Sequence, residues 1–253
     1  MIIDPLKRYG EWEWIEAGRP AAIATPSTGT NHIDLKFFQR MDVEVFSLLD
    51  DREGLETIRA SSEYTFLAIL LCLRRKAINA DERQKPGREL YEKTVGLVGL
   101  GRIGRNLRDW CSIFGAHILF YDPYVKGYSS PLVVMFRACN IIVLCCSLTK
   151  ETKGMVNKNL LDLCREGTII VNTARGEIVV EKDMLDFLSE RKDVTYFADV
   201  WEKELDGYPN PFYGLPNTIT SNHEAGNCLE SNRKAHEIAE RLLQNRATIT
   251  SDG

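Results

Sequence analysis

The sequence lacks the features of several protein classes. No apolar run approaches the roughly 18 residues that a membrane-spanning helix requires, and the first residues, MIIDPLKRYG, lack a signal-peptide pattern. The seven cysteines form neither a CxxC pair nor a metal-type cluster with histidine. A net charge of −4 argues against a nucleic-acid partner. We therefore expect a cytoplasmic protein with reduced cysteines and without a membrane, nucleic-acid or metal partner.

The composition is that of an ordinary folded chain. The 253 residues suffice for one large or two modest domains, and 44% of them are hydrophobic. From residue 94 onward, short apolar runs alternate with segments of helical periodicity; the runs are TVGLVGL (94–100), HILFYD (117–122), NIIVLCC (140–146), TIIVNTA (168–174), VTYFADV (194–200) and NTITSNH (217–223). Continuous apolar strands separated by helices predict a parallel sheet covered on both faces.

Helices are expected between these runs and on either side of them. A long helix over about 61–77 precedes the first run, and a strong helical pattern over 230–245 follows the last. Asn157 is a candidate cap for a helix that ends near residues 166–167. A smaller strand–helix–strand pattern at 21–26, 34–41 and 43–48 precedes the long helix.

A glycine-rich loop follows the first strand of the larger block. Gly99, Gly101 and Gly104 form a GxGxxG motif that leads directly into a predicted helix. Glycines in this context allow backbone N–H groups to approach a pyrophosphate at the helix N-terminus, where the helix dipole favours anions. The alternative is a purely structural strand-to-helix turn. The position between strand and helix favours a dinucleotide site.

Asp122 ends the next strand, 18 residues after Gly104. Its carboxylate is placed to accept hydrogen bonds from the hydroxyls of an adenosine ribose. A 2′-phosphate would face this carboxylate, and the residues that follow, Pro123 to Val125, offer no arginine to receive it. The sequence therefore predicts NAD rather than NADP.

Three further residues follow the ends of later strands. Arg175 follows the strand that ends near Ala174, Glu204 follows the one that ends near Val200, and His223 ends the last run. Ligands of doubly wound sheets bind outside the carboxyl ends of the strands. A histidine exchanges protons near neutral pH, a carboxylate orients its ring, and an arginine grips a carboxylate through two parallel hydrogen bonds. Together these residue types predict a hydride-transfer site beside the dinucleotide.

Each of the three residues also has a simpler interpretation. A single histidine at a strand end is more often structural than catalytic. Glu204 lies in a polar stretch, WEKELDGYPNP, that suits a surface loop, and Arg175 has Glu177 as a possible ion-pair partner. Their joint occurrence at one sheet edge favours the functional interpretation.

At this point the sequence resembles the D-isomer-specific 2-hydroxyacid dehydrogenases, the family that includes phosphoglycerate dehydrogenase. The likeness runs from about residue 23 to 245 and rests on ordered motifs: ATPSTGTNHIDL, ASSEYTF, VGLVGLGRIGRN, FYDPY, LTKETKGMVNK, GTIIVNTARGE, ADVWEKE and PNPFYGLPNTITSNHEAG. The fold it implies is α/β, with a Rossmann-type doubly wound parallel sheet that binds NAD and a truncated flavodoxin-like substrate domain.

The resemblance implies a role for each candidate residue. Arg175, in an N-x-x-R-G motif, would bind the substrate carboxylate, and His223, paired with Glu204, would be the general acid/base. The remaining positions would hold the cofactor, with Thr173, Ala174 and Asp199 near the nicotinamide; the others are Gly99, Gly101, Arg102, Ile103, Gly104 and Asp122. Glu224 departs from the family pattern, because a small or apolar residue usually follows the histidine.

The resemblance also sets expectations for the domains. It implies an NAD-binding domain over 62–227 and a discontinuous substrate domain formed by 1–61 and 228–253. Family members usually carry about 100 residues before the linking helix, whereas this sequence has about 60, so we expect a shortened substrate domain and impaired turnover. A homodimer through the NAD domain is implied by resemblance only.

The expected reaction is reversible hydride transfer between NAD and C2 of a 2-hydroxy or 2-oxo acid of the D series. The alternative, from a different functional class, is an NAD-binding sensor or scaffold, either corepressor-like or a catalytically impaired fragment. Within the enzymes, a formate-type reaction is disfavoured, because a formate site does not call for a His–Glu pair.

Overall fold

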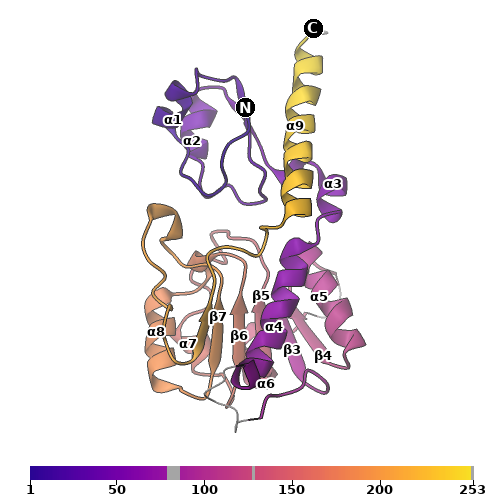
Figure 1. Ribbon diagram of the computed structural model, residues 1–253, viewed down its shortest axis with the longest axis vertical. Helices are drawn as coiled ribbons and strands as arrows, with labels where there is room; N and C mark the ends of the chain where they lie inside the picture. Colours follow the sequence, from indigo (N-terminus) through magenta and orange to yellow (C-terminus); the bar gives the residue numbers. More distant parts are fainter. Residues whose placement is uncertain (79–85, 127–128, 252–253) are drawn as a thin grey trace. The chain divides into compact units, whose positions relative to one another are not determined.

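The computed structural model describes residues 1–78, 86–126 and 129–251. The chain divides into two compact units (Figure 1). Unit 1 comprises Met1–Ala60, Leu205–Tyr208 and Gly226–Gly253, and unit 2 comprises Ser61–Glu204 and Pro209–Ala225. The predicted division, 62–227 against 1–61 and 228–253, differs from this one in the assignment of 205–208 and by one or two residues at the junctions.

Unit 2 is built on a six-stranded parallel sheet in the order β4-β3-β5-β6-β7-β8 (Figure 1). The strands are β3 (Thr94–Val98), β4 (His117–Tyr121), β5 (Ile141–Leu144), β6 (Ile169–Asn172), β7 (Thr195–Ala198) and β8 (Thr218–Thr220). β-branched residues dominate β5 and β6, as expected for strands buried on both faces. The order reverses between β3 and β5, and this switch point is where such sheets bind ligands.

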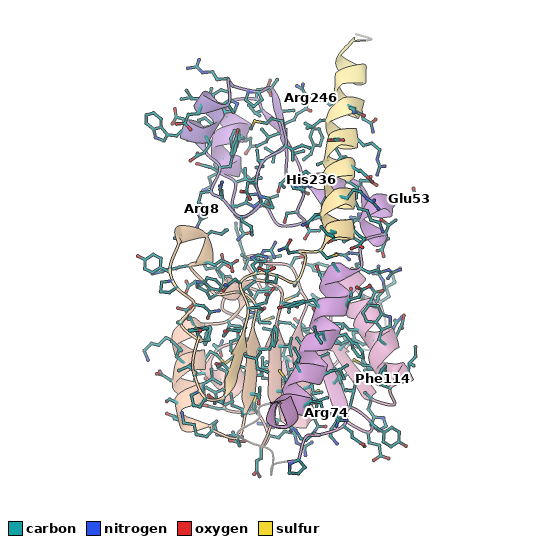
Figure 2. All side chains as sticks on the ribbon, in the orientation of Figure 1. Arg8, Glu53, Arg74, Phe114, His236 and Arg246 are labelled. Atoms are coloured by element: carbon teal, nitrogen blue, oxygen red, sulfur yellow. The ribbon has the colours of Figure 1, made fainter. Side chains whose placement is uncertain are left out.

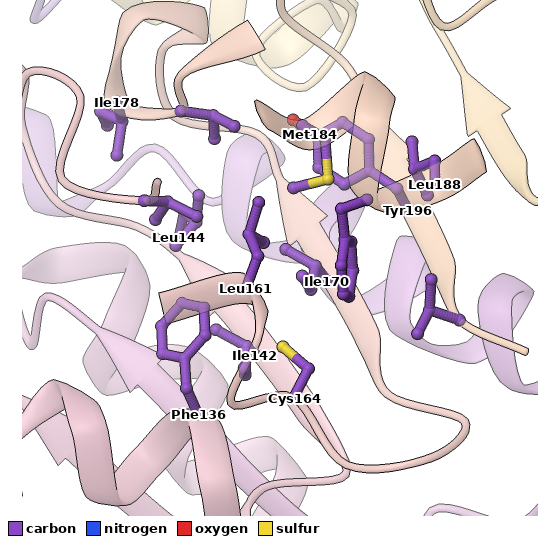
Figure 3. Packing of buried hydrophobic residues seen from close by; sticks show 14 of the residues in the cluster. Phe136, Ile142, Leu144, Leu161, Cys164, Ile170, Ile178, Met184, Leu188 and Tyr196 are labelled. Atoms are coloured by element: carbon purple, nitrogen blue, oxygen red, sulfur yellow. The ribbon is translucent and has the colours of Figure 1, made fainter. Parts of the chain in front are cut away.

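Helices cover both faces of this sheet. On one face, α4 (Ala60–Ile78) and α5 (Arg102–Ile113) pack against alternate residues of the strands, such as Ile141 and Val143 of β5. The other face carries α6 (Leu132–Ala138), α7 (Lys158–Leu161) and α8 (Glu181–Glu190). Figure 3 shows this second cluster, in which Phe136, Leu161 and Met184 surround Ile142 and Ile170 of the strands. The predicted fold class is confirmed.

One predicted helix is shorter than expected. Asn157 does cap α7, since its side chain accepts a hydrogen bond from the backbone N–H of Asn159. The helix ends at Leu161, however, and not near residues 166–167. The N–H groups of Leu163 and Cys164 bond to carbonyls three residues earlier, so the chain tightens into turns.

Unit 1 contains a parallel pair of short strands, β1 (Ala22–Ala24) and β2 (Glu44–Phe46), with Ile2 bridged to Ala24. The helices are α1 (Glu11–Glu16), α2 (Leu35–Arg40), α3 (Arg52–Glu56) and α9 (Leu229–Ser251). α1 was not expected from the sequence. An aromatic cluster of Trp14, Phe37 and Phe38 fills the core beside β1.

Long-range ion pairs join distant parts of the unit 1 chain. Arg246, labelled on α9 in Figure 2, donates from Nε to Oε2 of Glu44 at 2.7 Å. Arg241 of the same helix pairs with Asp51. Such pairs add modest stability where they are exposed. The first joins α9 to β2, and the second joins it to the N-cap residue of α3. Among the described residues, no helix has both the length and the apolar character required to cross a bilayer.

Candidate active site

The register of the sheet aligns the carboxyl ends of its strands. Val98 lies opposite both Tyr121 and Leu144, Leu144 opposite Asn172, and Ala198 opposite Asn172 and Thr220. The first residues beyond the six strands therefore form one row along the sheet edge: Asp122, Gly99, Cys145, Thr173, Asp199 and Ser221. Every predicted site residue belongs to this row or to the loop or helix that continues from it.

The three glycines of the loop after β3 differ in what surrounds them. Gly99 is left-handed, with φ of +100°, and a Cβ there would lie 2.8 Å from the backbone of Cys146. A Cβ on Gly104 would lie 2.2 Å from the carbonyl oxygen of Gly99, so this residue allows α5 to approach the loop. A Cβ on Gly101 would meet nothing within 4 Å. The absence of a side chain at Gly101 serves no packing need, which fits a position where an external group approaches the backbone.

The start of α5 has features that favour an anion. Gly101 is the N-cap, with no side-chain cap hydrogen bond, and Arg102 and Ile103 are the first helical residues. The N–H groups of a first helical turn lack intrahelical acceptors, and the helix dipole is positive at this end. A pyrophosphate supplies both the acceptors and the negative charge.

Asp122 lies beside this loop. Its Oδ2 accepts from the N–H of Leu100 at 2.8 Å and its Oδ1 accepts from the N–H of Tyr124 at 2.9 Å. An ionised carboxylate offers about four acceptor positions, roughly two on each oxygen. Each oxygen of Asp122 therefore keeps one acceptor position for a further donor. The two backbone hydrogen bonds therefore fix the orientation of the carboxylate, and its remaining acceptor positions suit the two hydroxyls of a vicinal diol.

Arg175 follows a turn organised by Asn172. The Asn172 side chain accepts from the N–H of Ala174 at 3.1 Å and donates to the carbonyl of Arg175 at 3.0 Å. Gly176 admits the neighbouring chain, because a Cβ there would lie 2.0 Å from the carbonyl carbon of Trp201. Burial lowers the pKa of the Arg175 guanidinium, and the nearby carboxylates of Glu204 and Glu177 oppose this shift.

A neighbouring threonine determines whether the Thr173 hydroxyl donates or accepts its hydrogen bond. Its Oγ1 lies 2.7 Å from Oγ1 of Thr65, which itself donates to the carbonyl of Ser61 at 2.6 Å. Since the single proton of Thr65 is used in that bond, Thr173 must donate to Thr65. Its oxygen then remains an acceptor for any further partner, such as an amide N–H.

His223 and Glu204 form a close pair. Nδ1 of His223 lies 2.8 Å from Oε1 of Glu204, and the two side chains are 26% and 9% exposed. An ionised carboxylate can only accept, so Nδ1 carries a proton and Nε2 is left for another partner. Glu204 interacts electrostatically with Arg175 as well. The structure thus brings Arg175, Glu204 and His223 together.

His223 lies beyond its strand in an uncommon backbone conformation. β8 ends at Thr220, three residues earlier, and the φ of His223 is +57°. This left-handed conformation costs a non-glycine residue roughly 1–2 kcal/mol, so the surrounding loop must impose it. The sequence pattern placed His223 at the end of the strand, and the turn was not foreseen.

Asp199 is fully buried directly after β7. Its carboxylate accepts hydrogen bonds from Oγ of Ser221 and from the N–H groups of Glu224 and Ala225. Its backbone carbonyl accepts from the N–H of His223 at 2.8 Å. The predicted contact of Asp199 with a nicotinamide stays a prediction, whereas its contacts with the histidine loop are direct.

Comparison with known proteins shows the family of this chain. The family model for the NAD-binding domain of the D-isomer-specific 2-hydroxyacid dehydrogenases matches residues 70–225 of the sequence. This range ends at the last residue of unit 2. The chain belongs to this dehydrogenase family. Residues 70–225 are its NAD-binding domain, so the predicted family and NAD cofactor are confirmed.

Named relatives extend over most of the chain. D-3-phosphoglycerate dehydrogenase of Archaeoglobus fulgidus is 28% identical over 226 residues, which cover 83% of this chain and 42% of that protein. Glyoxylate reductase of Pyrococcus furiosus is 27% identical over 251 residues, covering 90% and 73% respectively. The chain thus spans less than half the length of the first of these relatives.

The fold match is equally broad. The crystal structure of NAD-dependent formate dehydrogenase from Staphylococcus aureus in complex with NAD superposes with a TM-score of 0.82 at 23% identity. The match covers 96% of this chain and 77% of that one, and it shows the shared fold.

Proposed function

We propose that the protein transfers a hydride between NAD and C2 of a D-2-hydroxy acid, or of the corresponding 2-oxo acid, in a reversible reaction. The observation that carries the proposal is the hydrogen bond of 2.8 Å between His223 and Glu204, whose charge also acts on Arg175, at the carboxyl edge of an NAD-binding domain.

The residues present suit the cofactor. Gly99, Gly101 and Gly104, with the N–H groups of Arg102 and Ile103, would hold the pyrophosphate, and Asp122 would hold the adenosine ribose. Thr173, Ala174 and Asp199 follow β6 and β7 and would line the nicotinamide end; the Thr173 oxygen is free to accept from a carboxamide N–H. When bound, NAD supplies the carbon that accepts or returns the hydride.

His223 would exchange the substrate proton. With Nδ1–H donated to Glu204, Nε2 of the neutral ring is the base that takes the proton from the C2 hydroxyl during oxidation. In reduction the same nitrogen returns the proton to the C2 oxygen. Glu204 favours the imidazolium that forms in between, because its charge lies next to the ring. Such acid–base assistance is typically worth roughly 10²–10⁴ in rate.

Arg175 would bind the substrate carboxylate. A partly buried guanidinium binds an anion more strongly than an exposed one, because less water competes. Its planar fork matches the two carboxylate oxygens and would fix C2 between His223 and the cofactor. The substrate class proposed is therefore a small 2-hydroxy or 2-oxo carboxylic acid.

The cellular setting is also part of the proposal. All seven cysteines lie in the described part of the chain, and none forms a disulfide. Burial raises the pKa of five of them and Cys72 is buried as well, which suits a reducing cytoplasm. The homodimer through the NAD domain would use exposed apolar residues of unit 2 such as Leu67, Ile113 and Phe114.

The test is steady-state oxidation of NADH by a panel of 2-oxo acids, followed at 340 nm with the whole chain. Turnover of at least one acid supports the proposal, and we expect a rate below the ordinary enzyme range of roughly 1–10³ s⁻¹ because the substrate domain is short. Tight NADH binding without turnover on any acid would instead favour the sensor or scaffold interpretation.

A further inference from the structure

The loop that carries His223 is held from both sides by one residue. Asp199 accepts at Oδ1 from Ser221 Oγ (2.6 Å) and from the N–H of Glu224 (2.8 Å), and at Oδ2 from the N–H of Ala225 (3.0 Å). These donors lie before and after His223 in the sequence. A fully buried carboxylate is stable only when its hydrogen bonds are made, so the carboxylate and the loop conformation support each other.

Ser221 extends this arrangement to α4. The phenol of Tyr64, on α4, interacts with the Ser221 side chain through a hydrogen bond that acts to lower the pKa of Tyr64. Ser221 has a single proton, and Asp199 can only accept, so that proton is committed to Asp199. Tyr64 must therefore be the donor to Ser221. The result is a directed chain from Tyr64 to Ser221 and from Ser221 to Asp199.

The ring of Tyr64 is fixed independently of its hydroxyl. It makes an edge contact with Phe197 of β7, with centroids 6.1 Å apart. Burial raises the pKa of Tyr64; the hydrogen bond with Ser221 opposes this shift and the charges of Asp199 and Glu224 add to it, so the phenol stays protonated at neutral pH and can act as a donor. Removing only the hydroxyl leaves the ring packing in place.

We propose that Tyr64, Ser221 and Asp199 form a hydrogen-bonded chain that holds His223 in its left-handed conformation and thereby sets the direction of its imidazole. Tyr64 and Ser221 are positioning residues: they act on the reaction through His223. The consequence for turnover rests on the proposed function, whereas the consequence for the imidazole does not.

The hydrogen-bonded chain of Tyr64, Ser221 and Asp199 predicts effects of different size for substitutions along it. Ser221→Ala removes both hydrogen bonds of the hydroxyl, whereas Tyr64→Phe removes only the outer one, so the first change has the larger effect. We expect kcat to fall about tenfold for Ser221→Ala and about threefold for Tyr64→Phe, with the Kd for NADH within about threefold. Ser221→Thr keeps the hydroxyl and restores most of the loss.

A matched control lies in the same unit. Ser62 is a buried serine, whereas Ser221 is half-buried, and the Oγ of Ser62 accepts from Asn106 at 2.9 Å, on α5 rather than on the histidine loop. Ser62→Ala is the same chemical change and tests whether any lost serine hydrogen bond has the same result. We expect it to leave both the imidazole and kcat close to wild type.

The experiment is nitrogen-15 NMR of the imidazole groups of the whole chain, combined with kcat. The sequence has only four histidines, so the His223 signals are assigned by their loss in His223→Gln. In the wild type, Nδ1 carries the proton shared with Glu204, and the Nδ1 and Nε2 shifts are well separated. In Ser221→Ala we expect the Nδ1 and Nε2 chemical shifts of His223 to move toward each other, as in an imidazole whose two tautomers exchange freely. In Tyr64→Phe we expect the same change with a smaller size.

Two outcomes overturn the inference. One is an unchanged His223 pattern in folded Ser221→Ala and Tyr64→Phe; the other is an equal change in Ser62→Ala. If Ser221→Ala does not fold, Tyr64→Phe alone decides, because it keeps the Ser221–Asp199 bond. A changed imidazole in a protein that turns over no 2-oxo acid would support the positioning chain and reject the proposed function, so the two failures are distinguishable.

Discussion

The two halves of the sheet in unit 2 use different chemistry at the same edge. At the ends of β3, β4 and β5 the structure provides glycines, backbone N–H groups and one backbone-bound carboxylate, Asp122. At the ends of β6, β7 and β8 it provides the side chains Arg175, Glu204 and His223. In the proposed function, the first half would bind the cofactor through its backbone, and the second half would bind the substrate and exchange a proton through its side chains. The two should respond to mutation in separable ways.

The largest effect is expected in the glycine half, from Gly104→Ala. The new Cβ would lie 2.2 Å from the carbonyl oxygen of Gly99; the Cβ is fixed to the backbone of α5 and the oxygen belongs to the backbone, so neither can rotate away. Overpacking of this kind costs roughly 1–3 kcal/mol or more, and the loop must deform. We expect a lowered Tm and loss of measurable NADH binding.

The matched control is Gly101→Ala, since nothing lies within 4 Å of its Cβ and its φ of −70° suits alanine. That variant should keep the wild-type Tm while its Kd for NADH rises. A Tm loss as large as that of Gly104→Ala would show that Gly101 is also needed for packing.

The next effect belongs to the charged half. Arg175→Lys keeps the charge but loses the planar fork that makes two parallel hydrogen bonds. Since a hydrogen bond to a charged group is worth roughly 1.5–3 kcal/mol, we expect kcat/KM for the best 2-oxo acid to fall roughly 10- to 100-fold. NADH binding should be unaffected.

Arg108→Lys is the control, because Arg108 pairs with the exposed Asp109 on α5. Kinetic constants of Arg175→Lys that match those of Arg108→Lys would remove Arg175 from the carboxylate site.

The smallest effect concerns the choice of cofactor. Asp122→Asn removes the negative charge but keeps an oxygen that accepts from Leu100. We expect the Kd for NADH to rise by about 3- to 10-fold, while that for NADPH falls or stays constant, because a 2′-phosphate no longer faces a carboxylate. Fluorescence titration of both cofactors measures the ratio, with Asp109→Asn as the control. Wild-type protein that binds NADPH as tightly as NADH would refute the role assigned to Asp122.

Sequence reasoning was most successful where one local rule decided the structure. Apolar runs such as 141–144 and 169–172 form buried parallel strands, and the GxGxxG spacing gives the turn before α5. Strand ends meet at one edge of a parallel sheet, so the set of Arg175, Glu204 and His223 followed from topology.

The features that were missed depend on contacts between distant segments. The left-handed His223 is held by Asp199, 24 residues earlier, and no pattern in residues 217–223 encodes that bond. Tyr64 and Ser221 are separated by most of unit 2. The early end of α7 depends on i to i−3 bonds at Leu163 and Cys164, which a helical periodicity does not distinguish from a longer helix.

The most direct test of the account is a paired measurement on His223→Gln. This change removes the proton-exchanging group from the charged half and alters nothing in the glycine half. The account predicts that kcat with the best 2-oxo acid falls by roughly 10²–10⁴, while the Kd for NADH stays within about threefold of the wild type. His236→Gln, on α9 of unit 1 (Figure 2), should change neither quantity. Retained turnover in His223→Gln, or loss of NADH binding in the folded variant, would contradict the division of the site into two halves.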